Sequence, residues 1–371
     1  MEGGGPLITK RSWPLVTLLV VLAGIASPLA AQEKRKVIID QDAAGPASTD
    51  LQSVLVFIQS PQTEVLGITI VSGDQWRDEE VAHTLRMLEL IGRTDIPVVP
   101  GAVFPLVNSK EFQERWETLY GKTIYQGVWK DWRTHDMPVR GPWEIPPLPE
   151  GSPTTKPADE DAAHFIIRMV HKYPHQVTIY AGGPHTNLAL AIRIDPQVPE
   201  LAQELVFMGG SISAVLKSEG PQTQRREFNL WWDPEAVHIV LTAPWHKITD
   251  TTVDTSVKTN LTKAMIAEIA KSPNPVAKYI AKYATEGYMW DELAAAEWLD
   301  PSIITSESQW YMDIDCAHEG GYGNILIWDP GQQPGLSEQV VHVPMEINAE
   351  KFYKMFIDLM MRPTPGVRAT Q

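Results

Sequence analysis

The 371-residue sequence predicts an α/β fold, with a mostly parallel open sheet, helices on both faces and a single large domain. Three observations predict it. Short runs of β-branched residues alternate with segments that carry apolar residues at helical spacing, as in parallel sheets joined by right-handed crossovers. The alternation stops once and then resumes in the same form. Hydrophobic residues make up 43% of the chain, which is enough for a large core.

The first part of the alternation lies before residue 100. Val37–Asp40 is a short apolar run that ends in an acid, as expected of a buried parallel strand. Further strands are expected at 65–71 and 98–99, and helices at 50–59 and 78–91. This order of elements implies that the strands are parallel.

The second part begins after residue 158. Its expected elements begin with a helix at 161–171, a strand at 177–180, a helix at 186–194, a strand at 205–208 and a helix at 233–241. Helices within 261–284 and at 292–299 follow, then strands from 309 and a last helix at 349–361. Between the two parts, residues 102–158 are rich in Pro and Trp. We expect them to form an irregular insertion over the sheet, as a lid, an oligomer surface or a packed loop.

The N-terminus has the pattern of a secretory signal peptide, which we place at residues 1–31. Lys10 and Arg11 precede an apolar stretch and a small-residue exit. The apolar stretch is shorter than the roughly 20 residues of a membrane span, although a retained N-terminal anchor is the alternative. The mature domain is then 32–371, and we expect it to be secreted or periplasmic.

Charge and cysteine content narrow the function. The formal net charge is −15, which argues against a nucleic-acid partner because phosphates require Lys and Arg. The excess of acidic over basic residues suits an enzyme that binds a cation or a neutral substrate. Cys316 is the single cysteine, so the chain has no internal disulfide, and we expect it to be a buried structural residue.

Three aspartates surround the end of the first strand. Asp40 and Asp42 alternate onto the same side of the strand, and a loop of small residues leads to Asp50 at a helix start. Open parallel sheets bind ligands at the carboxyl ends of their strands. Clustered carboxylates repel one another unless a cation neutralises them, and oxygen ligands favour calcium or magnesium. The alternative is structural, with Asp50 capping its helix and Asp40 bracing the loop.

Three further clusters follow strands or open helices. They are Gly182–Asn187, Met208-Gly209-Gly210 with Glu227-Phe228-Asn229 downstream, and Trp290-Asp291-Glu292. Together with Ile38–Asp50, and in this order, they resemble the inosine-uridine-preferring nucleoside hydrolase family over residues 36–305. The resemblance implies that family's fold, a Ca²⁺ ion at the bottom of the active site, and hydrolysis of the N-glycosidic bond of a nucleoside.

The resemblance also assigns roles by position. Asp42 resembles the carboxylate that binds the metal and acts as general base. Asp50 and Asp291 resemble further metal ligands, and Gly182 stands where a main-chain carbonyl binds the metal. Asp40 would orient the loop from behind these ligands.

Five positions are expected to contact the substrate, and Asp74 and Trp290 are two of them. Glu227 and Asn229 fall where the family binds the ribose hydroxyls, and we expect Asn187 of the second cluster to contact the substrate as well.

Several positions depart from the family pattern. The loop before Thr49 is longer than usual, and Thr49 stands where the family has the first of two adjacent aspartates, which touches the 2′-hydroxyl. Asp74 replaces the usual asparagine, which either restores that carboxylate or indicates a different sugar. Trp290 replaces a histidine that protonates some leaving bases, and it can stack on a base. His185 is the candidate acid in its place, with a structural role as the alternative, whereas His83 is not expected to be catalytic.

The leading hypothesis is therefore an exported, calcium-dependent hydrolase of ribonucleosides or related ribosides. A catalytically altered protein that keeps the metal and binds a nucleoside or sugar is the alternative, which Thr49 and Trp290 favour. A D-x-D phosphatase is a third class, but Ala43-Ala44 follows Asp42 where a hydroxyl residue is expected. Family resemblance suggests a homodimer or homotetramer, and no membrane partner is expected once the signal is removed.

Overall fold

The computed structural model describes residues 1–5, 33–123, 125–129, 140–213 and 226–366. The chain divides into two units, Met1–Glu33 and Lys34–Gln371, and the second contains every element described below. The predicted signal peptide falls mostly on residues 6–32, outside the described residues, so its boundary stays a prediction. Within the described ranges, none of the helices combines the length and the apolar character that crossing a bilayer requires.

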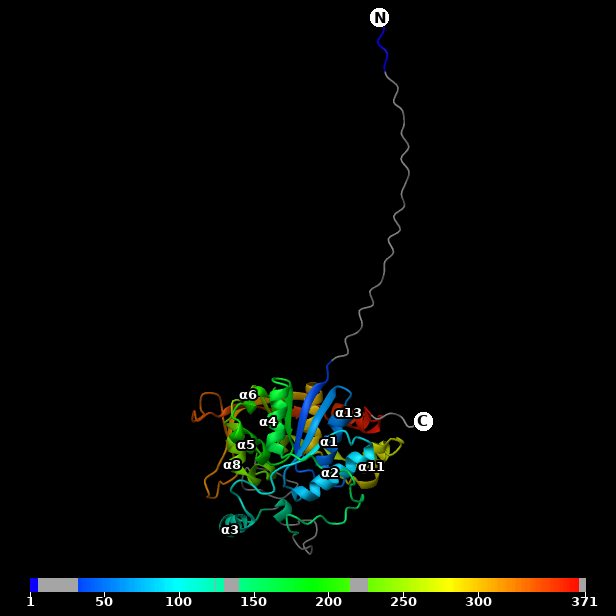
Figure 1. The fold of residues 1–371 in the computed structure, drawn as a ribbon. Helices are drawn as coiled ribbons and strands as arrows, with labels where there is room; N and C mark the ends of the chain where they lie inside the picture. Colours follow the sequence, from blue (N-terminus) through cyan, green and yellow to red (C-terminus); the bar gives the residue numbers. More distant parts are fainter. Residues whose placement is uncertain (6–32, 124, 130–139, 214–225, 367–371) are drawn as a thin grey trace. The chain divides into compact units, whose positions relative to one another are not determined.

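A mostly parallel sheet organises the second unit (Figure 1). Within the described residues its strand order is β10-β9-β11-β6-β5-β4-β1-β2-β3. The neighbouring strands from β11 to β3 pair in parallel, and β9 is antiparallel to both of its neighbours. The predicted fold class is thus confirmed. The strands are β1 (Arg35–Gln41), β2 (Thr63–Ile70), β3 (Val98–Pro100), β4 (Val177–Ala181), β5 (Glu204–Met208), β6 (Ile248–Thr251), β9 (Ile304–Ile314), β10 (Ile325–Trp328) and β11 (Gln339–Ile347).

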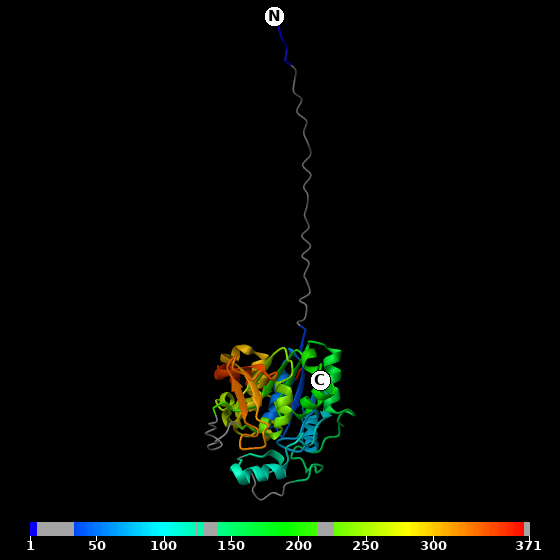
Figure 2. The same ribbon diagram turned by 90° about the vertical axis from the view of Figure 1, so that its left-hand side faces the viewer.

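Helices cover both faces of the sheet (Figures 1 and 2). Alternation along β1 sends Val37 and Ile39 into one core and Ile38 into the other. One face carries α1 (Thr49–Gln59), α2 (Arg77–Ile91), α11 (Pro275–Tyr283), α12 (Trp290–Leu299) and α13 (Ala349–Met361), and the other carries α4 (Ala162–Lys172), α5 (Thr186–Ile194) and α8 (Pro234–Leu241). The shorter elements are α6 (Val198–Leu201), α7 (Phe228–Trp232), α9 (Val253–Ser256), α10 (Lys263–Ile269), η2 (Pro301–Ile303), β7 (Asn260–Leu261) and β8 (Gly287–Tyr288).

The predicted insertion at 102–158 is not wholly irregular, and that expectation is wrong for residues 110–120. They form α3 (Lys110–Tyr120), and η1 (Gly127–Trp129) follows. Ser109 caps α3 by accepting a hydrogen bond from the Phe112 backbone N–H at 3.1 Å. Both views place α3 beyond the carboxyl ends of the strands (Figures 1 and 2). The insertion therefore covers the edge of the sheet where a ligand is expected.

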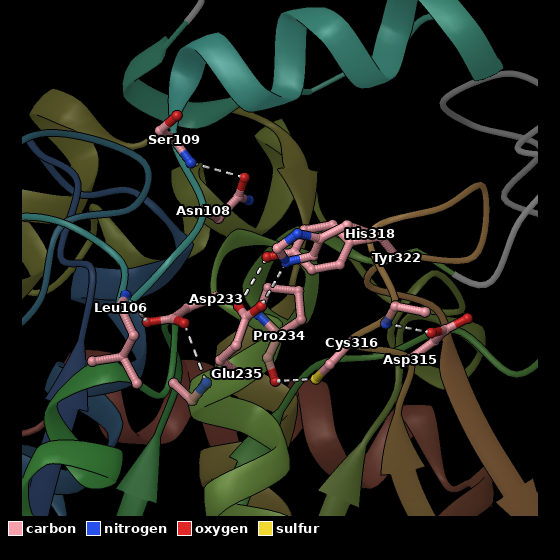
Figure 3. Close-up of polar contacts among 12 residues, drawn as sticks. Leu106, Asn108, Ser109, Asp233, Pro234, Glu235, Asp315, Cys316, His318 and Tyr322 are labelled. Carbon is pink, nitrogen blue, oxygen red and sulfur yellow. Dashed lines mark hydrogen bonds and ion pairs between the residues drawn. The ribbon is translucent and has the colours of Figure 1, made fainter.

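The start of the insertion is fixed to the second half of the chain (Figure 3). The Leu106 backbone N–H donates to the Asp233 carboxylate at 2.9 Å. The Asn108 amide donates to the main-chain carbonyls of Trp231 and Trp232, both at 3.1 Å. Each of these hydrogen bonds pairs a side chain with a backbone group, and together they attach the first residues of the insertion to 231–233. The thiol of Cys316 donates to the Pro234 carbonyl at 3.5 Å in the same region.

Candidate active site

A cavity of about 1320 Å³ opens at the carboxyl ends of the strands. Asp42, Gly182 and Met208, which follow or end β1, β4 and β5, form part of its floor. The starts of α1 and α12 form one wall, and the insertion contributes side chains such as Trp116 from the other side. The cavity thus lies where parallel sheets place their ligands.

Asp42 is fixed at the bottom of this cavity. Its Oδ2 accepts a hydrogen bond from the Asp74 backbone N–H at 3.1 Å, and only 2% of the residue is exposed. Burial, and then the charges of Asp74 and Asp50, raise the pKa of the Asp42 carboxyl well above its usual range. Its environment therefore favours taking up a proton or binding a cation.

Asp50 and Asp291 meet across the same wall. Their carboxyl groups are hydrogen-bonded to each other, and burial raises the pKa of both well above the ordinary value. Ser48 donates to Asp50 Oδ2 at 2.8 Å, and Gln41 Nε2 donates to Asp291 Oδ2 at 3.2 Å. The first turns of α1 and α12 thus direct the carboxyls of Asp50 and Asp291 into the same part of the cavity wall.

The long loop between Asp42 and Asp50 is tied down along its length. The Gly45 backbone N–H donates to Gln75 Oε1 at 3.1 Å, and the Ala47 backbone N–H donates to the Tyr279 hydroxyl at 2.9 Å. A Cβ on Gly45 would lie 2.3 Å from the His83 ring, so the ring packs directly against the loop. The extra length is accommodated by specific contacts.

Gly182 also lies at the floor, where a side chain would displace the Gln41 amide. A Cβ there would lie 1.8 Å from Gln41 Oε1. The Gly182 carbonyl accepts from the Asn229 amide at 2.7 Å, and that amide also donates to the Met208 carbonyl at 3.1 Å. Asn229 therefore lines the cavity while fixing the ends of two strands.

The charges of Asp42, Asp50 and Asp291 are not neutralised by neighbouring basic side chains, as is expected of residues that bind a cation. In the described part of the chain, Asp42, Asp50 and Asp291 form no salt bridge with a basic side chain within 4.0 Å. Asp291 Oδ1 is buried and has no hydrogen-bond partner. Among the described residues, no three His, Cys, Asp or Glu side chains are already arranged as a metal site. A cation would therefore have to draw these carboxylates together and use a main-chain oxygen such as that of Gly182.

Asp74 and Tyr125 form a pair that sequence spacing did not reveal. Both line the cavity, and burial raises the pKa of the Tyr125 hydroxyl well above its usual range, followed by the charge of Asp74 and a hydrogen bond to it. Tyr125 belongs to the insertion, in which no regular pattern indicated the direction of its side chain. Asp74 itself lies in the cavity, as predicted for a substrate contact.

Glu227 lines the cavity from the start of α7. Its carboxylate accepts from the backbone N–H groups of Gly210 at 2.9 Å, Asn229 at 3.0 Å and Leu230 at 3.3 Å. The carboxylate therefore caps the helix and closes the glycine turn after β5. The position of Glu227 in the cavity agrees with the predicted substrate contact, whereas its role as a helix cap was not predicted.

Thr49 and Glu292 join the two helix starts in the cavity wall. The Thr49 hydroxyl donates to Glu292 Oε2 at 2.5 Å and accepts from the Asp291 backbone N–H at 3.4 Å. Next to them, Trp290 lines the cavity and packs on Tyr288, with ring centroids 4.7 Å apart. Glu292 was noted only as part of its cluster and given no role of its own.

Three predicted site residues do not line the cavity. Asp40 is fully buried and accepts from Thr69 Oγ1 at 2.5 Å and Asn187 Nδ2 at 2.8 Å, so both Asp40 and Asn187 lie behind the loop that joins Asp42 to Asp50. This placement suits the expected support role of Asp40, but it does not bring Asn187 to a substrate.

His185 is fully buried against Phe207 with ring centroids 4.9 Å apart, and burial lowers its pKa to about 3. The structure therefore does not place His185 as the acid, since its ring is neutral and outside the cavity. His83, in contrast, lines the cavity and is held by Glu150 through Nδ1. From the sequence, His83 was expected only on a helix face, and nothing indicated that it would line the cavity.

Comparison with known proteins agrees with this architecture. The model of the family described as "Inosine-uridine preferring nucleoside hydrolase" matches residues 37–354. A probable uridine nucleosidase 2 from Arabidopsis thaliana is 28% identical over 68% of this chain and 70% of its own length. The pyrimidine-specific ribonucleoside hydrolase RihA from Enterobacter sp. is 27% identical over 74% of this chain and 82% of its own.

Solved structures show the same fold. A purine-preferring ribonucleoside hydrolase from Gardnerella vaginalis superposes with a TM-score of 0.69 at 20% identity, covering 88% of this chain and 98% of its own. A plant nucleoside hydrolase gives a TM-score of 0.67 at 22% identity, covering 89% and 99%.

Proposed function

Because the chain belongs to the inosine-uridine preferring nucleoside hydrolase family, whose members are hydrolases acting on N-glycosyl compounds, we propose that it cleaves the N-glycosidic bond of a ribonucleoside or related riboside in a calcium-dependent reaction. One observation carries this proposal. Buried carboxyls of Asp42 at the floor and of Asp50 and Asp291 in the adjoining wall line one large cavity, and none is in a salt bridge with a described basic side chain.

The ligand set that we propose is made of oxygen atoms. Asp42, Asp50, Asp291 and the carbonyl of Gly182 would hold the cation, and hard oxygen ligands in this number suit Ca²⁺. The unpartnered Asp291 Oδ1 supports this assignment. When bound, the cation supplies polarisation of a water molecule and neutralises the acids around it. Asp40 supports the set from behind, through its bonds to Thr69 and Asn187.

Asp42 is the proposed general base. Its carboxylate would accept a proton from the water that attacks the anomeric carbon, and its fixed position beside Gly73 and Gly183 orients it for that transfer. Surrounding carboxylates stabilise the positive charge that develops on the sugar. Asp74, Glu227 and Asn229 line the same cavity and are the proposed contacts to the sugar.

The aromatic side chains offer a surface for the base. Trp290 and Tyr288 pack together at the cavity wall, and Phe228 lines the opposite region beside Tyr125 at a centroid distance of 4.8 Å. Flat apolar rings stack on a nucleobase without selecting one base strongly. A panel of purine, pyrimidine and nicotinamide ribosides therefore identifies the leaving group.

The proposal is tested by metal content and by Asp42→Asn. Purified protein is expected to carry about one Ca²⁺ per chain, as a single oxygen-ligand site would. Asp42→Asn removes the proton acceptor, so release of reducing sugar from ribosides should fall by at least about 100-fold, the scale of general-base catalysis. Asp358→Asn is the matched control, because that carboxylate is exposed on α13 and pairs with Lys354.

Two results would contradict the proposal. Metal-free protein that is fully active would remove calcium from the reaction. Unchanged turnover in Asp42→Asn, with the fold verified by circular dichroism, would remove Asp42 from the chemistry. Binding of the ribosides with no turnover of any of them would favour the alternative of a metal-containing binding protein, which the Thr49 and Trp290 positions support.

Export and assembly are part of the same proposal. The basic start and short apolar stretch of residues 1–31 support a cleaved signal and a secreted or periplasmic location. N-terminal sequencing of protein recovered outside the cytoplasm tests the cleavage. Family membership supports a homodimer or homotetramer, which light scattering measures directly.

A further inference from the structure

Arg226 lines the cavity and is a buried cation to which the proposed reaction gives no role. Only 6% of the residue is exposed, and it forms no salt bridge within 4.0 Å to a described Asp or Glu. Burial lowers the pKa of its guanidinium to about 10, so the group is still charged at neutral pH. Because an unpaired buried charge is costly, this position favours an anionic ligand.

The acid whose charge acts on Arg226 is Glu117 of α3, and it is engaged elsewhere. Its Oε1 accepts from the Thr123 backbone N–H and from Gln126 Nε2, both at 2.6 Å, and its Oε2 accepts from Lys122 Nζ at 3.3 Å. Among the described residues, none of the aspartates that line the cavity adds to the charges that act on Arg226. The guanidinium therefore lies apart from the carboxylates of the cavity floor, in a region that Lys122 also lines.

Two indole rings hold this guanidinium in one orientation. The Cζ of Arg226 lies 3.7 Å from the ring centroid of Trp116 and 5.1 Å from that of Trp231. Its Nη2 donates to Gln113 Oε1 at 3.2 Å, and its buried Nε has no hydrogen-bond partner among the described residues. A guanidinium carries five N–H donors, so the protein leaves most of this capacity unused. The planar fork matches a phosphoryl group, to which it can donate two parallel hydrogen bonds.

The cavity has room for more than a nucleoside. Its volume of about 1320 Å³ exceeds the roughly 300–1,000 Å³ of pockets that enclose drug-sized ligands. Arg226 directly precedes Glu227, a proposed sugar contact, and Phe228 of the aromatic surface. A group attached to the sugar would therefore find both space and a cation on this side of the cavity.

The chemistry of the sugar limits where such a group is attached. A phosphoryl group on the 2′- or 3′-oxygen stays beside the ring, where the carboxylates of the cavity floor repel it. The 5′-oxygen stands on an exocyclic carbon, so a group on that oxygen extends away from the ring. A 5′-phosphate thus keeps its charge apart from the acids and within the region of Arg226.

We propose that Arg226 forms a phosphate subsite of this cavity and that the preferred substrate is a riboside 5′-monophosphate. The inference rests on the proposed function, because it names the substrate class of the same site. The reaction adds one water across the N-glycosidic bond and releases the free base and ribose 5-phosphate, and the phosphoester bond stays intact. Arg226 touches the substrate in this arrangement, and Gln113 is a positioning residue that orients the guanidinium.

The test compares inosine and uridine with their 5′-monophosphates in wild type and in Arg226→Met. Methionine keeps an unbranched apolar side chain between the two indoles but has no charge. A hydrogen bond to a charged group is worth about 10- to 100-fold in kcat/KM, so wild type should prefer the monophosphate over its nucleoside by roughly that factor. Arg226→Met should bring the ratio close to 1, mainly by raising KM for the monophosphate.

Two further variants separate the charge from its surroundings. Arg226→Lys keeps a positive charge without the planar fork, so part of the preference should remain. Arg168→Met is the matched control, because Arg168 is 50% exposed on α4 and pairs with Glu160. Its ratio of monophosphate to nucleoside activity should equal that of wild type.

Three results of these kinetics would overturn the inference and leave the proposed function standing. A parallel fall in kcat/KM for nucleoside and monophosphate in Arg226→Met, with an unchanged ratio, would mean that the stacked guanidinium only supports the fold. Wild type that hydrolyses nucleosides without preferring their 5′-monophosphates would lack the subsite. An equal preference for 3′-monophosphates would remove the assignment to the 5′-oxygen.

Binding distinguishes the subsite from the reaction. If none of these compounds is hydrolysed, the proposed function fails, and calorimetry with ribose 5-phosphate, ribose and inorganic phosphate still tests the subsite. Binding of ribose 5-phosphate that is at least about tenfold tighter than that of either other ligand, and that is lost in Arg226→Met, would support it. Equal affinities for ribose 5-phosphate and inorganic phosphate would show that a free anion is bound and would overturn the inference.

Discussion

The position of Asp42 depends on two glycines that flank it. A Cβ on Gly73 would lie 2.1 Å from Asp42 Oδ2, and one on Gly183 would lie 2.6 Å from the Asp42 backbone nitrogen. The order of acids and glycines along the chain was sufficient to predict that they meet. The direction of each side chain within the strand-to-helix turn was not, which is why His185 and Asn187 were expected in the cavity and instead lie behind it.

Gly183→Ala tests this close approach. The new Cβ would meet a backbone atom, which cannot rotate away, so the turn or the Asp42 segment must shift. We expect a loss of about 1–3 kcal/mol in the free energy of unfolding, as for overpacked cores, and a fall in kcat with little change in KM. Chemical denaturation and riboside kinetics measure both effects.

The control for this prediction is Gly287→Ala. Gly287 also lines the cavity, but a Cβ there meets nothing within 4 Å. Equal stability and activity of Gly183→Ala and Gly287→Ala would show that the approach of Gly183 to Asp42 is not needed.

At the scale of elements, an aromatic cluster joins the insertion to α7. It consists of Trp76, Trp129, Trp231 and Trp232, and Trp129 of η1 stacks on Trp232 with centroids 4.0 Å apart at 27°. The Val128 backbone N–H also donates to the Gly73 carbonyl at 3.0 Å. The richness in Trp predicted that the insertion packs over the sheet, but neither α3 nor these partners could be read from residues so distant in sequence.

Trp129→Ala should loosen this cover. The change removes a stacked indole that is 4% exposed, and losses of roughly 3–5 kcal/mol are typical of such truncations. We expect a lower melting temperature, faster proteolysis within 102–158 and a higher KM for ribosides, because the cavity loses one side. Trp143→Ala is the control, since Trp143 belongs to the same insertion and is 64% exposed. Similar proteolysis rates for the two variants would contradict a covering role.

At the scale of the whole molecule, β1, β2 and β4 were predictable because each is a run rich in β-branched residues that a helix follows. β6 was not, since Ile248–Thr251 is four residues long with one apolar side chain and owes its place to pairing with β5 and β11. The place of Asp42 at the floor of the cavity was predictable because Asp42 directly follows β1. Tyr125 and His83 were not, because their place in the cavity comes from the packing of the insertion and α2.

β6 and α12 are joined by a buried acid whose charge opposes folding. Thr251 Oγ1 donates to Glu297 Oε2 at 2.6 Å, Glu297 Oε1 has no partner among the described residues, and burial raises the Glu297 pKa from 4.5 to about 8. The folded state therefore holds this proton more tightly than the unfolded chain does. It follows that the contribution of Glu297 to the free energy of unfolding is greatest below pH 4.5 and decreases as the pH rises toward 8.

Glu297→Gln should remove this part of the pH dependence. The amide oxygen still accepts from Thr251, but no charge forms, so the variant should match wild type near pH 4.5 and exceed it at pH 9 by on the order of a few kcal/mol. Thermal unfolding at the two pH values measures the difference. The pH-dependent contributions of the cavity carboxyls cancel in this comparison because wild type and variant both contain them. An equal shift of melting temperature at pH 4.5 and pH 9 would mean that Glu297 acts through packing and not through its charge.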